Sequence, residues 1–148
     1  MPVKLRAALD LVARVAWAGP LLVRVALAAI FIPSGWGKLH HLAQVEQYFA
    51  SLHIPAPGAQ AAMVSVIELV AGIAVLLGLG TRVAGALLVA VMTVAIYTAK
   101  WPAIHSATDL AATVEFAYLA MAAWLVTAGA GAASADHLLG RAWAAPRR

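Results

Sequence analysis

Four apolar runs, each about as long as the hydrocarbon core of a bilayer is thick, constrain this chain more than any other feature. They cover roughly residues 20–38, 59–79, 81–99 and 110–128. A membrane-spanning helix needs about 20 predominantly apolar residues, and four such helices joined by short turns would leave a soluble protein almost no polar surface. The composition agrees, because 64% of the residues are hydrophobic and only 11% are charged. We therefore expect an all-α membrane protein, with one domain over residues 1–148 built as a bundle of four transmembrane helices.

Two shorter amphipathic helices are expected outside these spans. Arg6, Asp10 and Arg14 recur every four residues, which predicts an N-terminal helix lying on the membrane surface. The alternative is a basic leader without fixed structure. The connection after the first span repeats apolar residues at three- and four-residue steps, at Leu42, Val45, Phe49 and Leu52. This spacing predicts an amphipathic helix that contacts either lipid or the rim of the bundle.

The basic residues that flank the spans predict the orientation of the bundle. The side shared by both termini and the second turn carries seven of them: Lys4, Arg6, Arg14, Arg82, Arg141, Arg147 and Arg148. The opposite side carries only Lys38 and Lys100. Because cytoplasmic loops are enriched in lysine and arginine, we expect both termini in the cytoplasm of a bacterium and the chain in its inner membrane.

Ionisable residues inside or at the ends of the spans are the best candidates for function, because an unpaired charge in a bilayer costs a few kcal/mol or more. Arg24 in the first span and Glu68 near the middle of the second are predicted to form an intramembrane ion pair. Lys38 and Glu115 lie near the outer ends of their spans and are predicted to meet there. Either pair could serve function or only fix the register of the helices.

The stretch FIPSGWGKLHH, residues 31–41, suggests a binding pocket near the outer face. Glycines permit close approach of a ligand or a neighbouring helix, a tryptophan offers a flat apolar wall, and a lysine offers a hydrogen-bond donor. The predicted ligand-binding residues are Gly35, Trp36, Lys38, His41, His105 and Glu115. The combination suits the head group of a quinone, but also a lipid head group or plain helix packing.

Several other functions are disfavoured by the residue content. The chain has no cysteine, which excludes disulfides, thiol redox pairs and cysteine-ligated metals. Its histidines lack the i, i+4 spacing of a helical metal site and none lies well inside a span, so neither a metal nor a haem is predicted. The net charge of +4 is expected to meet anionic lipid rather than nucleic acid.

Three motifs together resemble the DoxX family of small bacterial membrane proteins. They are SGWGKL at the end of the first span, HIPAP after the amphipathic connection, and IELVAGIAVLLGLGTRVAGALLVAVM across the second and third spans. The resemblance covers roughly residues 20–128 and implies a four-helix fold. It also implies kinship with the small subunit of a thiosulfate:quinone oxidoreductase, and marks Arg24, Lys38, Glu68 and Glu115 as the matching polar positions.

Two classes of function follow. The first is a membrane subunit of a DoxX-type oxidoreductase complex, which binds a quinone-like or lipid ligand and works with a soluble redox enzyme. The second is a non-catalytic membrane scaffold or a carrier of small solutes. The sequence leaves open the substrate, the partner protein, the oligomeric state and whether the chain takes part in catalysis.

Overall fold

A computed structural model describes residues 13–144 of the chain, and their side chains as far as Arg141. The described residues form helices and turns. The α-helices are α2 (Ala18–His40), α3 (Leu42–Ser51), α4 (Pro57–Leu77), α5 (Thr81–Ala95), α6 (Ala107–Ala111), α7 (Val114–Ala128) and α8 (Ala135–Ala144). A π-helical turn, η1 (Ile96–Lys100), and a 3-10 turn, η2 (Trp101–Ala103), extend α5. The expected all-α membrane bundle is thereby confirmed.

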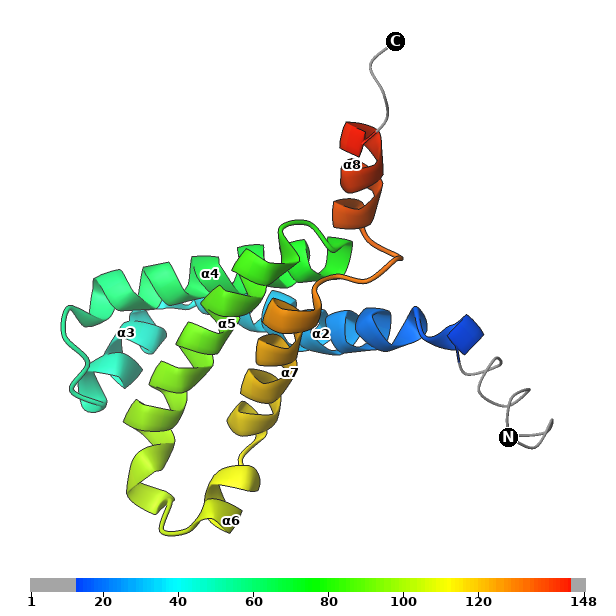
Figure 1. Cartoon of the computed structure of the whole chain (residues 1–148). Helices are drawn as coiled ribbons and strands as arrows, with labels where there is room; N and C mark the ends of the chain where they lie inside the picture. Colours follow the sequence, from blue (N-terminus) through cyan, green and yellow to red (C-terminus); the bar gives the residue numbers. More distant parts are fainter. Residues whose placement is uncertain (1–12, 145–148) are drawn as a thin grey trace.

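The bundle consists of two helix pairs that diverge toward one end (Figure 1). Helix α2 packs mainly against α4, and α5 packs mainly against α7. The two pairs meet at the end that holds the α4–α5 turn, and they separate toward α3 and α6. An apolar core between the pairs includes Leu27, Val75, Leu88 and Leu125, all of them fully buried. The start of α2 and the helix α8 lie at the same end as the α4–α5 turn, which we call the α8 end. The end toward which the pairs separate, with α3 and α6, is called the α3 end.

The last of the four expected spans is shorter than predicted. Three helical segments are long and apolar enough to cross a bilayer, at Ala13–His40, Pro57–Leu77 and Thr81–Ala103, whereas α7 has only 15 residues. The run from residue 110 to 128 is interrupted because Thr113 adopts an extended backbone and its side chain accepts a hydrogen bond from the N–H of Phe116. A threonine in this position caps a new helix rather than continuing the old one.

The predicted amphipathic connection is the helix α3. Its apolar side chains Val45 and Phe49, followed by Leu52, face a cavity inside the bundle, so the helix lies on the rim. The chain then turns through His53 and Ala56, which both have a positive φ, and Pro57 occupies the first turn of α4. Proline is favoured there because the N–H it lacks would have no partner in the helix. The predicted N-terminal surface helix falls largely on residues 1–12, outside the described residues.

The α4–α5 turn is held by the start of α8, a helix that we did not predict from the sequence. Gly78 takes the left-handed conformation that ends α4, with the N–H of Leu79 donating to the carbonyl oxygen of Ala74. The carboxylate of Asp136 accepts hydrogen bonds from the N–H groups of Gly80 (2.7 Å) and Thr81 (3.0 Å). These donors begin α5 and have no partner within the helix, so Asp136 caps α5 from a distant part of the chain.

We expect this cap to make the stability of the α8 end depend on pH in the acid range. Burial alone would raise the pKa of Asp136, but the hydrogen bonds from Thr81 and Gly80 and the charge of Arg24 outweigh it and lower the pKa. A carboxylate whose pKa is lowered by folding stabilises the protein above its ordinary pKa of about 3.9, and loses that contribution as the pH falls through the folded-state value. We expect the melting temperature to fall below about pH 4, and Asp136→Asn to flatten that part of the profile. Equal pH profiles for the two proteins would contradict this role.

Gly35 sets the distance between α2 and α4. A Cβ atom on Gly35 would lie 2.5 Å from the backbone nitrogen of Leu69 and 2.7 Å from the carbonyl oxygen of Ser65. Both atoms belong to the backbone of α4 and cannot turn aside. The glycine thus allows the close helix contact that small residues provide in membrane bundles.

Gly35→Ala is therefore expected to push α2 away from α4 and to destabilise the protein by about 1–3 kcal/mol. Gly37 is the matched control, because a Cβ at this position two residues away would meet nothing within 4 Å. Denaturant unfolding in detergent measures both changes. If Gly37→Ala is as damaging as Gly35→Ala, the close contact does not govern stability.

Candidate functional site

A cavity of about 1020 Å³, open on one side, lies between the two helix pairs where they separate toward α3. Side chains of α2, α3, α4, α5 and α7 line it, together with the turns η1 and η2. Most of its wall is apolar, and a few polar groups converge on it, among them Lys38, Glu68 and Glu115. A large apolar cavity with a small number of placed polar groups is the usual form of a small-molecule site.

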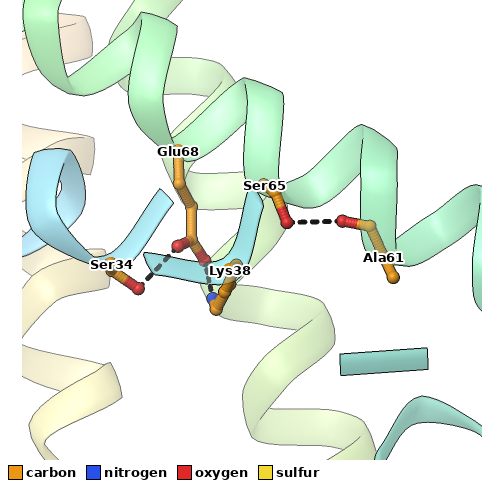
Figure 2. Close-up of polar contacts among 5 residues, drawn as sticks. All are labelled: Ser34, Lys38, Ala61, Ser65 and Glu68. Carbon is orange, nitrogen blue, oxygen red and sulfur yellow. Dashed lines mark hydrogen bonds and ion pairs between the residues drawn. The ribbon is translucent and has the colours of Figure 1, made fainter. Parts of the chain in front are cut away.

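The main polar feature of this cavity is an ion pair between Lys38 and Glu68 (Figure 2). The ammonium nitrogen of Lys38 lies 2.5 Å from Oε1 of Glu68, and the hydroxyl of Ser34 donates to Oε2 at 2.8 Å. Ser34 and Lys38 are four residues apart, so they lie on the same face of α2, opposite the glutamate of α4. The side chain of Glu68 is 2% exposed and that of Lys38 is 31% exposed. The carboxylate is thus fixed inside the protein, while part of the Lys38 side chain is accessible and lines the cavity.

The predicted ion pair between Arg24 and Glu68 is wrong. Arg24 is 2% exposed, and among the described residues its guanidinium group donates only to backbone carbonyl oxygens. Two of these are at the end of α4, Val75 (2.8 Å) and Leu76 (2.5 Å), and two are in the loop after α7, Ala130 (3.1 Å) and Ala133 (2.6 Å). The last carbonyls of a helix have no partner within it, which makes them good acceptors for a buried arginine.

The predicted contact between Lys38 and Glu115 is also wrong, because each residue pairs with a different partner. Glu115 forms an ion pair with Lys100 at 3.2 Å, and both side chains are partly exposed. Both pairs nevertheless line the same cavity, with Lys38 and Glu68 on the α2–α4 side and Lys100 and Glu115 on the α5–α7 side. Lys38 and Glu115 therefore do line the cavity, as expected, without touching each other.

The other predicted ligand-binding residues do not line the cavity. Gly35 is buried against α4, as described above. Trp36 is 59% exposed and its ring lies against His40, with the ring centres 4.5 Å apart. The ring nitrogen Nδ1 of His41 contacts the carbonyl oxygen of Gly37 on its own helix. His105 is exposed in the loop before α6, where its backbone N–H donates to Asp109.

Other polar residues that we did not single out from the sequence line this cavity. Ser34 completes the hydrogen bonding of Glu68, and Tyr48, His53 and Tyr118 contribute polar groups from α3, the α3–α4 turn and α7. Ser34 could have been found from its four-residue spacing to Lys38, which places both on one face of a helix. The others come from elements whose placement depends on tertiary packing.

The charged groups of the cavity balance one another. Each of its two lysines lies against a glutamate, at 2.5 Å and 3.2 Å. An anionic ligand would have to compete with those carboxylates for the ammonium groups, and a cation would have to compete with the lysines. The cavity is therefore suited to an uncharged ligand that accepts a hydrogen bond.

Comparison with known proteins places the chain in a family. The family model for DoxX matches residues 19–101, a range that contains Lys38 and Glu68 but ends before Glu115. The chain is 34% identical over 101 residues to a Bacillus subtilis (strain 168) protein named "Putative oxidoreductase CatD", an alignment that covers 68% of this chain and 70% of that protein. It is also 34% identical over 64 residues to Inner membrane protein YqjF of Escherichia coli (strain K12), over 43% of this chain and 48% of that protein. No solved structure matches significantly. The match to the family model and the extent of the similarity to CatD show that the chain belongs to the DoxX family.

Proposed function

We propose that this protein is the membrane subunit of an oxidoreductase complex and that its cavity binds an uncharged, quinone-like molecule. The observation that carries the proposal is the apolar cavity lined at its polar end by the partly exposed side chain of Lys38, whose ammonium group is a hydrogen-bond donor. A quinone carbonyl accepts one hydrogen bond from such a donor, and its ring fits an apolar wall. The name of the Bacillus relative adds support for an oxidoreductase.

A lipid head group fits the cavity less well than a quinone. The head groups of common phospholipids carry a phosphate, and anion sites in proteins supply cations or N–H groups free to bind it. Here both lysines of the cavity already face a carboxylate. This charge balance favours the neutral ligand over the lipid.

The binding proposal can be tested by tryptophan fluorescence, because Trp101 lines the cavity. A short-chain benzoquinone is titrated into the purified protein in detergent, and the quenching is compared with that of Trp101→Phe. We expect saturable quenching that depends on Trp101. Quenching that never saturates, or that is unchanged in Trp101→Phe, would show that the cavity does not bind the quinone. Displacement of the quinone by phosphatidylglycerol would favour the lipid instead.

Two variants on the same helix sharpen this test. Ala95 lines the cavity and Ala86 does not. Ala95→Phe should fill part of the cavity and weaken quinone binding at least tenfold, whereas Ala86→Phe, at an exposed position of α5, should leave it unchanged. Equal affinities for the two variants would argue against this cavity as the site.

The role as a subunit of a complex needs a separate experiment. We expect native mass spectrometry of the protein, purified from its own membrane, to show a co-purifying redox enzyme. If the protein carries no quinone, and its deletion releases another enzyme from the membrane, it is instead the non-catalytic scaffold that the sequence also allowed.

We further infer that both termini lie in the cytoplasm. The lysines at the α3 end, Lys38 and Lys100, are each paired with a glutamate, whereas Arg82 and Arg141 are exposed at the α8 end. The positive-inside rule then places the α8 end in the cytoplasm. A phosphatase that is active only in the periplasm should be inactive when fused after Arg148 and active when inserted after His53. The opposite pattern would reverse the orientation.

A further inference from the structure

A second hollow lies next to the cavity on the outside of the bundle. It is an apolar groove of about 350 Å³ between α4 and α5, and it shares Ile67 and Leu87 with the cavity. From these two residues it runs toward the α4–α5 turn, where it ends near Leu79 and Gly80. The cavity and the groove therefore adjoin at Ile67 and Leu87, with the polar cavity toward α3 and the apolar groove toward the α8 end.

The sequence builds this groove by continuing the same faces of two helices. On α4, Ile67, Val70 and Ala74 follow one another at three- and four-residue steps, which places them on one face of the helix. On α5, Val83 and Leu87 are four residues apart and also share a face. At a rise of about 1.5 Å per residue, the part of the groove from Ile67 to Ala74 is about 10 Å long. That length is suited to a hydrocarbon chain rather than to a ring.

The groove is open to the side of the bundle that faces lipid. Val70 is 59% exposed and Val83 is 68% exposed. The cavity is bordered on the same side by Met63 of α4 and Val94 of α5, which are about half exposed. An apolar molecule dissolved in the bilayer could therefore enter sideways between α4 and α5 without crossing water.

We propose that the α4–α5 groove holds the hydrocarbon chain of the same neutral molecule whose polar head occupies the cavity. This inference rests on the proposed function, and it specifies the ligand further: a membrane-dissolved quinone that carries a long alkyl or isoprenoid chain. The groove adjoins the cavity at Ile67 and Leu87 and follows the same faces of α4 and α5, so a head near Lys38 would direct an attached chain into it.

The groove determines where the chain lies more than how tightly the ligand binds. A bilayer is as apolar as the groove, so transfer of a chain from lipid to protein provides little hydrophobic free energy. A test of affinity alone would therefore miss the groove, and the position of the chain must be measured directly.

Photo-crosslinking measures that position. A benzoquinone with a ten-carbon chain that ends in a diazirine is added to the full-length protein in nanodiscs, and labelled residues are mapped by mass spectrometry. We expect labelling at Val70 and Val83, and displacement of that label by excess short-chain benzoquinone. A ten-carbon alcohol with the same diazirine is the control; its labelling should not respond to the quinone.

Matched variants test the groove itself. Ala74 lines the groove, while its neighbour Ile73 is 41% exposed on a different face of α4. Ala74→Phe should at least halve the displaceable label at Val70, Ile73→Phe should not, and neither should change the quenching of Trp101 by the short-chain quinone. Val83→Phe, on the opposite wall, serves as a second blocking variant should Ala74→Phe fold poorly.

The possible failures point to different proposals. If the short-chain quinone quenches Trp101 but the chain label is spread evenly over lipid-facing residues, the groove proposal is overturned and the cavity proposal stands. The same holds if the alcohol labels the groove as strongly as the quinone probe and the short-chain quinone displaces neither. If the short-chain quinone does not bind at all, both proposals fall.

Discussion

Replacement of Lys38 by methionine is expected to destabilise the protein by about 3–5 kcal/mol, because it leaves a buried carboxylate without its counter-charge. Glu68 is 2% exposed, and only the hydroxyl of Ser34 would still donate to it. Glu68→Gln should cost less, since the amide oxygen still accepts a hydrogen bond and Lys38, at 31% exposed, can turn toward the cavity. The asymmetry follows from the different burial of the two partners.

The double variant Lys38→Met with Glu68→Leu should regain most of the stability lost in Lys38→Met, since no buried charge remains. The control is Lys100→Met: its partner Glu115 is 20% exposed, so the loss should stay below about 1 kcal/mol. Denaturant unfolding in detergent gives all four values. If Lys38→Met is no more damaging than Lys100→Met, burial of Glu68 does not make its ion pair important.

Arg24→Leu is expected to cost at least as much, about 3–5 kcal/mol, because it removes the charged donor of four hydrogen bonds, two of which are buried. A hydrogen bond to a charged group is worth about 1.5–3 kcal/mol, and Leu76, Ala130 and Ala133 each lose one. Val75 keeps the N–H of Gly78 as a donor, but Ala130 is buried, and a buried acceptor left unpaired costs about 1–3 kcal/mol. Arg24→Lys should recover only part of the loss, since one ammonium group cannot replace the planar fork that reaches both α4 and the loop after α7.

Two controls separate this role from an ion pair. Arg82 is exposed, with one long hydrogen bond of 3.4 Å to Thr127, so Arg82→Leu should change the free energy of unfolding by about 0.5 kcal/mol or less. Arg24→Leu and Glu68→Leu should add within about 0.5 kcal/mol, because the two side chains do not touch. A coupling of more than 1 kcal/mol between them would restore the ion pair that the sequence suggested.

Residue type and spacing alone predicted the membrane class, three of the spans, the helix α3 and the polar positions that need a partner. The lengths of the apolar runs gave the membrane class and the first three spans, since the thickness of a bilayer leaves little choice of helix length. The cost of an isolated charge in lipid identified Arg24, Lys38, Glu68 and Glu115 as positions that need partners. The spacing of Val45 and Phe49 gave the helix α3 and its apolar face.

The partners themselves were decided by the tertiary structure. From their expected depths in the bilayer, Arg24 could have reached Glu68. In the structure, the close contact of α2 with α4 at Gly35 instead places Ser34 and Lys38 against that glutamate. Arg24 is ten residues, about 15 Å, further from the α3 end than Ser34, and there it meets the end of α4. Reasoning from the sequence considers charged side chains as partners of a buried arginine. The acceptors that Arg24 uses are backbone carbonyl oxygens, which every residue has.

For the same reason, the sequence predicted a pocket with Lys38 and Glu115 but could not predict most of the residues that line it. The lining of the cavity depends on the angle at which the α2–α4 and α5–α7 pairs diverge. The packing of the core and the hydrogen bonds of Arg24 and Asp136 at the α8 end hold the pairs at that angle. Spacing along one helix shows which of its residues share a face. Only the packing of helices distant in the sequence shows that Trp36 and His41 face away from the cavity, while Tyr118 and Glu115, some 80 residues later, line it.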